Sequence, residues 1–246
     1  MVFLKKRISG RIPRASVLKL LLLLCCILAA VFIGVQLVRL IASPALQSAG
    51  GTAGEGVILI DPGHGGMDGG ASAADGTLEK DINLAIALPL ADMLRFFGYP
   101  VEMTRDTDCS IHDPGLSTVK EQKVSDLKNR LEMVNGSRLT ISIHENQFSQ
   151  TQYSGAQIFD GSGSAESALL ADSVREAVVG LLQPDNTREL KKGSKDIYLL
   201  HNAKTPIILV ECGFLSNTAE LQKLKDPSYQ QSMAYAIACG LLRYET

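Results

Sequence analysis

From residue 57 onward, short runs rich in β-branched residues alternate with longer segments of helical periodicity. The short runs cover residues 57–60, 100–104, 139–143, 156–159 and 207–211. The helical patterns cover residues 78–98, 119–135, 164–182 and 228–243. Strands that alternate with helices in this way form a mostly parallel sheet with helices on both faces. We therefore predict an α/β fold built on a single twisted, mostly parallel sheet.

The first helical segment carries one conflicting signal. Its apolar side chains recur at helical spacing from Ile82 to Phe97. Gly98 should end the helix, because glycine readily adopts the left-handed conformation found after helices. Pro89 lies inside the pattern and lacks the backbone N–H that a helix uses, so we expect it to kink or split the helix.

Residues 1–42 differ from the rest of the chain. Residues 1–19 contain six basic residues and no acid, and the 19 residues that follow contain one polar side chain, Gln36. That length reaches the ~20 residues of a membrane-spanning helix, and the basic flank predicts a cytoplasmic N-terminus. The alternative is a cleaved signal peptide. Both interpretations place residues 57–246 outside the cytoplasm, either anchored to the membrane or secreted. Residues 43–56 are small and Gly-rich, and we predict a flexible linker there.

Overall charge and cysteine content exclude some classes of protein. The formal net charge is −2, so nothing indicates a nucleic-acid partner. Three cysteines follow residue 57, namely Cys109, Cys212 and Cys239. Their odd number and wide spacing fit neither a disulfide framework nor a zinc-finger pattern.

Polar residues stand where several predicted strands end. His64 follows the first strand, His144 directly follows the third and Glu211 closes the last, while Glu79 opens the first helix. The carboxyl ends of parallel strands meet at one edge of a sheet. Two imidazoles and one carboxylate are a common zinc ligand set with an open fourth position, and a second carboxylate can transfer protons. The spacing leaves open whether Glu79 or Glu211 binds the metal. Glu79 is favoured because it lies close to His64 in the chain.

Other interpretations of these residues stay open. A single histidine or glutamate at a strand end is usually structural, so the residues alone support a metal hydrolase and a non-enzymatic domain about equally. One enzymatic rival is a cysteine hydrolase that uses Cys212. A membrane-anchored glycan-binding module is a rival without catalysis. A phosphate-binding domain is a third, although the glycine run lacks the lysine and hydroxyl of a phosphate loop.

Five blocks of sequence point to a known family. They are ILIDPGHGGMDGGA, LEKDINLAIAL, TRDTD, ISIHENQF and VECGFLSN, in that order. Together they resemble the zinc-dependent N-acetylmuramoyl-L-alanine amidases of the amidase-3 family, over residues 57–244. The stretches YSGAQIF, DIYLL and LLRY are most similar to the germination-specific members of that family, which prepare spore-cortex peptidoglycan.

The resemblance implies a reaction and a role for each residue. One Zn²⁺ ion would be held by His64, Glu79 and His144, with Glu211 as the catalytic glutamate. The implied reaction is hydrolysis of the amide between the lactyl group of N-acetylmuramic acid and L-alanine of the peptidoglycan stem peptide. In sporulation this cut would prepare muramic lactam formation, with a muramic acid deacetylase as functional partner.

Two further residues are candidates for substrate binding, and a few positions depart from the family pattern. Asn146 and Arg105 are the candidates, although Arg105 is equally explained as a surface or structural ion-pair residue.

Gln147 and Phe148 follow Asn146 where relatives usually have a small residue, and Glu145 adds a carboxylate next to His144. These departures leave the zinc ligands intact and leave the substrate preference open.

Overall fold

The computed structural model describes residues 56–161 and 164–246. The predicted membrane anchor or signal sequence at residues 1–42, and all of the predicted linker except Gly56, lie outside these ranges. Within the described ranges, no helix is both long enough and apolar enough to cross a membrane.

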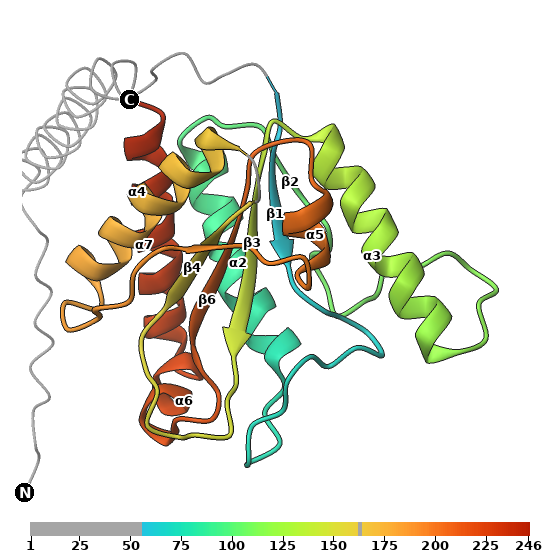
Figure 1. Ribbon diagram of the computed structural model, residues 1–246, viewed down its shortest axis with the longest axis horizontal. Helices are drawn as coiled ribbons and strands as arrows, with labels where there is room; N and C mark the ends of the chain where they lie inside the picture. The colour runs from blue at the N-terminus through green and yellow to red at the C-terminus, as the bar shows by residue number, and fades with distance from the viewer. Residues whose placement is uncertain (1–55, 162–163) are drawn as a thin grey trace, which may run out of the picture. The chain divides into compact units, whose positions relative to one another are not determined.

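A six-stranded sheet forms the centre of the domain (Figure 1). Its strands are β1 (Ile58–Pro62), β2 (Val101–Met103), β3 (Leu139–Asn146), β4 (Gln157–Asp160), β5 (Lys191–Lys192) and β6 (Ile207–Phe214). They lie in the order β2-β1-β3-β6-β4-β5. Every neighbouring pair is parallel except β4 and β6, which are antiparallel. This arrangement confirms the predicted mostly parallel sheet.

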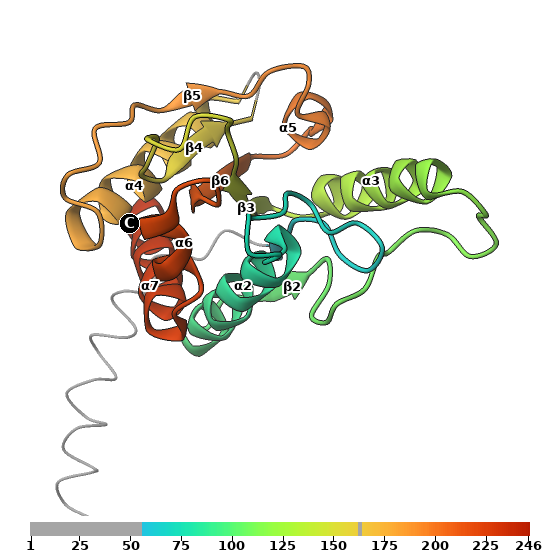
Figure 2. The same cartoon turned by 90° about the horizontal axis from the view of Figure 1, so that it is seen from below.

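Helices cover both faces of the sheet (Figure 2). They are α2 (Glu79–Phe96), α3 (Val119–Gly136), α4 (Ala165–Leu181), α5 (Tyr198–Asn202), α6 (Thr218–Leu224) and α7 (Pro227–Tyr244). Apolar residues of α2, α4 and α7 form the larger core on one face. A smaller core on the other face joins α3 and α5 to β1 and β6. All five residues of β1 are buried, as expected for a strand covered on both faces.

Local sequence signals fix where several helices begin. Thr118 and Glu121 form a reciprocal capping box at the start of α3. The side chain of Ser164 accepts a hydrogen bond at the start of α4, and Asp226 does the same for α7, which has Pro227 in its first turn. These caps satisfy backbone N–H groups that have no partner inside the helix.

Of the two effects predicted for Pro89, a kink or a split, the split is wrong, because helix α2 is one continuous element. Proline in a helix interior costs about 3 kcal/mol. Ile86, Leu90 and Leu94 are fully buried on the inner face, and each such side chain contributes about 1.5–3 kcal/mol, which outweighs that cost. The predicted stop at Gly98 is confirmed: its φ is +90°, and its N–H donates to the carbonyl oxygen of Arg95 at 3.0 Å.

Three short elements were not expected from the sequence, namely β5, α5 and α6. With two, five and seven residues respectively, they are too short to show a period in the sequence. The residues of α5 pack their apolar side chains against the sheet beside β6. Tertiary contacts therefore define these elements more than local pattern does.

The strand register brings the predicted site residues together. In the parallel pairing of β3 with β6, His144 lies opposite Glu211. Paired residues on neighbouring strands project to the same face, so both side chains point toward α3 and α5. The chain leaves β1 at Pro62, opposite Ile143, and His64 follows two residues later. Figure 1 shows the start of α2 beside the carboxyl end of β3.

Candidate metal centre

His64 is held in a strained conformation at the end of β1. Its φ of +63° makes it the one non-glycine residue with positive φ in the described part of the chain. Such a conformation costs about 1–3 kcal/mol and persists only where surrounding contacts hold it. The His64 carbonyl oxygen accepts a hydrogen bond from the Arg130 guanidinium at 2.6 Å, and its ring Nδ1 lies 2.9 Å from Asp68 Oδ2.

Two glycines make room for the histidine rings. A Cβ atom at Gly63 would lie 2.2 Å from Cε1 of the His144 ring. At Gly70, which has a φ of +68°, a Cβ atom would lie 2.5 Å from Glu79 Oε2 and 2.7 Å from His64 Cδ2. These distances are too short for any side chain. The glycine-rich turn is therefore needed for the close approach of the imidazoles and the carboxylate.

Glu79, the first residue of α2, presents one carboxylate oxygen to both histidines. Its Oε2 atom accepts a hydrogen bond from the Ala71 N–H at 2.8 Å, which fixes the carboxylate. Its Oε1 atom lies 2.8 Å from His144 Nδ1 and 3.3 Å from His64 Nε2. The loop after β1 therefore folds back over the sheet edge and brings Glu79 to both histidines.

His64, Glu79 and His144 form a group that can hold a metal ion. Their ligand atoms all lie within 4.8 Å of one another. Four-coordinate zinc, with bonds of about 2.0–2.2 Å, separates neighbouring ligand atoms by about 3.3–3.5 Å. The 3.3 Å between His64 Nε2 and Glu79 Oε1 agrees with that value. Asp68 accepts from Nδ1–H of His64, so the tautomer that leaves Nε2 free for a metal is favoured.

Without a cation between them, these groups shift one another's protonation. Burial lowers the pKa of His64, but its hydrogen bonds to Asp68 and Glu79 outweigh burial and raise that pKa to about 9. For Glu79, burial raises the pKa, while His144 and His64 together hold it well below its usual range. At neutral pH the metal-free site therefore places the Glu79 carboxylate beside a His64 ring in its positively charged, doubly protonated form.

Glu211 lies beside this group and is available for proton transfer. Burial raises its pKa to about 7, with His144 acting in the opposite direction. Its Oε2 atom is buried and has no hydrogen-bond partner among the described residues. An unsatisfied buried carboxylate oxygen is costly in a folded protein and is a feature of functional sites.

A buried ionic network supports the loop that carries His64. Arg130 of α3 donates to Asp61 Oδ1 at 2.5 Å and to Asp126 Oδ2 at 2.6 Å. Asp61 also accepts hydrogen bonds from Thr104 and Ser142, at 2.8 and 2.7 Å. Through Arg130, which also donates to the carbonyl oxygens of Pro62 and His64, Asp61 orients the backbone of this loop.

Replacing Arg130 with Met should lower the free energy of unfolding by about 3–5 kcal/mol, because the Asp61 carboxylate would stay buried without a countercharge. Urea unfolding of the purified protein measures this loss. The matched control is Arg175→Met, which removes an exposed ion pair with Asp172 and should cost less than about 1 kcal/mol. Equal losses for the two variants would contradict the assignment.

Two residues that sequence reasoning missed also hold the site. Asp68 Oδ2 contacts His64, while its Oδ1 lies 2.8 Å from Nζ of Lys123 on α3. This contact links the glycine-rich loop to the helix across the site. The position of Asp68, four residues after His64, was visible in the sequence. Lys123 is distant in the chain, and no local pattern marks it.

Arg105 and Asn146, the predicted substrate-binding residues, have different surroundings. The Arg105 guanidinium is buried and donates to the carbonyl oxygens of Pro62, Gly63, Lys80 and Thr107. These bonds hold the His64 loop against the start of α2. Asn146 ends β3 where the register with β6 shifts. A contact of either residue with substrate stays a prediction.

Two neighbours of the ligand residues are directed away from the metal group. Cys212 is fully buried, and burial raises the pKa of its thiol well above the usual range, which argues against the cysteine-hydrolase rival. Burial likewise raises the pKa of the Glu145 carboxyl well above its usual range, helped by nearby Glu211 and Glu79. The backbone N–H of Glu145 contacts the site by donating to Glu79 Oε1 at 3.2 Å.

Two cavities meet at the metal group, between α3 and α5. One, of about 160 Å³, is lined by His64, Asp68 and Lys123. The other, of about 300 Å³, is lined by Glu211, Tyr198 and Leu209. His144, Leu127 and Leu199 line both cavities. A bond held at the metal group therefore has space on either side for the two halves of a substrate.

Comparisons with known proteins agree with this geometry. The family model described as N-acetylmuramoyl-L-alanine amidase matches residues 58–243. The germination-specific N-acetylmuramoyl-L-alanine amidase of Bacillus subtilis is 38% identical over 192 residues, which are 77% of this chain and 80% of the relative. The CwlD amidase of Clostridioides difficile, solved in complex with the GerS lipoprotein, is 39% identical with a TM-score of 0.74, covering 77% of this chain and 98% of that one. An N-acetylmuramoyl-L-alanine amidase of Clostridium difficile 630 is 29% identical, with a TM-score of 0.66 over 76% of this chain and 95% of that one.

Proposed function

The chain belongs to the N-acetylmuramoyl-L-alanine amidase family and is an amide hydrolase of that kind, and we propose that it uses one zinc ion held by His64, Glu79 and His144. The observation that carries this proposal is the convergence of these ligand atoms within 4.8 Å beside the buried carboxylate of Glu211. When bound, zinc supplies a Lewis acid and lowers the pKa of a coordinated water to about 7.

Glu211 transfers the proton in the proposed reaction. Its carboxylate accepts a proton from the attacking water as oxygen bonds to the lactyl carbonyl carbon. It then donates that proton to the nitrogen of L-alanine as the carbon–nitrogen bond breaks. In the metal-free protein burial raises the pKa of Glu211 to about 7, and a group that both accepts and donates a proton works best when its pKa lies near the working pH.

The product ends test this function directly. The purified protein, incubated with peptidoglycan, should release peptides with a free L-alanine amino group and leave muramic acid with a free lactyl carboxyl group. Mass spectrometry of both fractions identifies the broken bond. Peptides that start at any other residue would contradict the assigned bond, and binding without cleavage would favour the glycan-binding rival.

Zinc uptake should release protons, because metal and proton compete for Nε2 of His64. The pKa of His64 is about 9 in the absence of metal, so its ring is protonated throughout the range from pH 6 to 8. We expect about one proton released per zinc bound and an affinity that rises about tenfold per pH unit in this range. Calorimetry in buffers of different ionisation enthalpy measures both quantities, and a pH-independent affinity would count against His64 as a ligand.

The cellular role is proposed from the relatives. Similarity to the germination-specific amidase supports a role in spore-cortex peptidoglycan that precedes muramic lactam formation. Such a substrate lies outside the cytoplasm, which is where the predicted anchor or signal sequence would place the domain. The solved partner of the Clostridioides difficile relative is a lipoprotein and not a deacetylase. A lipoprotein is therefore proposed as a binding partner, and the deacetylase stays a predicted functional partner.

A further inference from the structure

A cavity of about 720 Å³ lies outside the metal centre and is larger than either cavity of the cleft. It is lined by the segment before β4, by the connection between α4 and β5, and by α6 with its N-cap and the start of α7. None of His64, Glu79, His144 and Glu211 lines it. The reaction as proposed gives this cavity no role.

The polar groups of Glu220 and Asn186, which line the cavity, form hydrogen bonds within the protein. Glu220 accepts hydrogen bonds from the backbone N–H groups of Gly155 and Phe214, at 2.8 and 2.9 Å. Asn186 donates to the carbonyl oxygen of Ala156 at 2.9 Å. These groups are used by the protein itself. The groups left for a ligand are therefore on the rim.

Arg188 is the main cationic group on that rim. Its guanidinium carbon lies 4.6 Å from the centre of the Phe214 ring and 5.8 Å from that of Tyr153. Its Nε donates to the Ser154 carbonyl oxygen at 2.8 Å. These contacts hold the guanidinium in one orientation, as cation–π stacking does.

This arginine has no acidic partner, unlike most others in the described ranges. Those ranges contain seven arginines, of which five pair with a carboxylate. Arg105 is buried against carbonyl oxygens. Among the described residues, Arg188 is the arginine that lines this cavity, and neither it nor Lys223 on the same rim forms an ion pair with a carboxylate of the described chain. Asp185, an exposed acid, lies on the rim as well.

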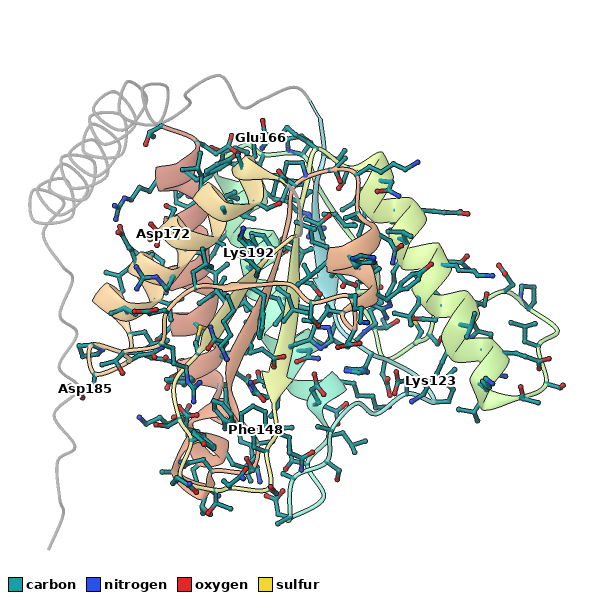
Figure 3. The ribbon with its side chains drawn as sticks, viewed as in Figure 1. Lys123, Phe148, Glu166, Asp172, Asp185 and Lys192 are labelled. Carbon is teal, nitrogen blue, oxygen red and sulfur yellow. The ribbon has the colours of Figure 1, made fainter. Side chains whose placement is uncertain are left out.

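Two exposed aromatic rings, those of Phe148 and Tyr153, pack on the buried Phe214 ring between this cavity and the edge of the sheet that carries the metal group. The Phe148 ring lies 5.5 Å from that of Tyr153 and 5.3 Å from that of Phe214. Phe214 pairs with Asn146, which is two residues beyond His144 and so about 7 Å further along β3. Figure 3 shows Phe148 at the lower end of β3. A polymer bound at the metal centre can therefore extend over these rings to Arg188.

We propose that this cavity binds a free carboxylate of a peptidoglycan stem peptide on a repeat next to the one being cut. The inference rests on the proposed function for the identity of the polymer. A guanidinium presents paired donors that match a carboxylate, and its stacking on the rings leaves these donors directed outward. A polymer that is already bound at the metal centre presents its next carboxylate to Arg188 at a high effective concentration. This second contact therefore raises the apparent affinity for a polymer but not for a single repeat.

Co-sedimentation with insoluble peptidoglycan tests the proposal. The full chain carries Glu211→Gln to prevent turnover, with or without Arg188→Gln. The peptidoglycan is first treated with hydrofluoric acid, which removes attached phosphate polymers, so that phosphate cannot be the anion that Arg188 binds. We expect Arg188→Gln to weaken binding about fivefold, as for one charged contact at a half-exposed site. Arg175→Gln, an exposed arginine on α4, is the matched control and should bind like the parent. Peptidoglycan with amidated stem carboxylates should show no difference between parent and Arg188→Gln.

The outcomes separate this inference from the proposed function. Equal binding of parent and Arg188→Gln to peptidoglycan with free carboxylates would overturn the inference. Should Arg188→Gln fold poorly, as judged by thermal melting, Lys223→Gln provides the same comparison without disturbing the aromatic stack. Protein that needs Arg188 for sedimentation but cleaves no lactyl amide in its unsubstituted form would support the inference and contradict the proposed function.

Discussion

The Glu211→Gln variant should keep its zinc and its fold but lose about 10²–10⁴-fold in kcat, the range contributed by general acid–base catalysis. Glutamine has nearly the same shape as glutamate, so the metal ligands and the cleft would stay in place. Its amide cannot accept a proton from water or return one to the leaving nitrogen. Turnover of a soluble muropeptide, measured together with metal content, gives both numbers.

A suitable control for this variant is Glu145→Gln. Glu145 is a second buried carboxyl, on the same strand as His144, and burial raises its pKa well above the usual range. The proposed reaction gives it no part in proton transfer, so glutamine should replace it with little loss of turnover. If Glu211→Gln retained full activity, or lost its zinc, Glu211 could not have the proton-transfer role assigned to it.

The His144→Ala variant should lose both zinc and activity, down to the background of the assay. It removes one of two imidazole ligands and leaves Glu79 with one histidine partner, where two now hold its carboxylate. The variant should still fold, because half-exposed His144 lies at the end of β3 and not within the core. Metal analysis after dialysis and a turnover assay measure the two losses.

His201→Ala is the matched control for that variant. His201 lies on α5, outside the metal group, and is exposed. Its removal should change neither metal content nor turnover. Stoichiometric zinc in His144→Ala would show that this imidazole is not a ligand.

Part of the candidate site could be predicted because two of its residues stand at strand ends. His144 and Glu211 directly follow or close buried apolar runs, and the parallel register then places them side by side. The family resemblance assigned His64 and Glu79 as well, and the structure brings both to the same edge. The loop after β1 folds back over the sheet, and the hydrogen bond from the Ala71 N–H to Glu79 helps to hold it there.

The supporting contacts could not be predicted, because they join distant parts of the chain. Arg130 reaches Asp61 across 69 residues of sequence. Neither residue type nor spacing indicates that pairing. Lys123 lies on the same helix as Arg130, and its contact with Asp68 depends on how α3 packs. Arg105 was open between substrate binding and a structural ion pair. Its observed partners are backbone carbonyl oxygens, which no sequence motif specifies.

The errors in the predicted fold have the same origin. Pro89 is a strong local signal against a continuous helix, yet α2 continues because its inner face is buried. Helix α5 gives almost no local signal, yet Leu199 and Leu200 pack it against β6 and so form one wall of the cleft. Packing decides both cases, because burial of several side chains exceeds a single backbone preference.

Titration of the metal-free protein with zinc, followed by cleavage of the lactyl–alanine amide at each step, tests the central claim most directly. The account predicts no cleavage without metal, a linear rise with added zinc, and a plateau at one zinc ion per chain. Cleavage by the metal-free protein at the full rate would contradict it, as would zinc uptake that brings no activity.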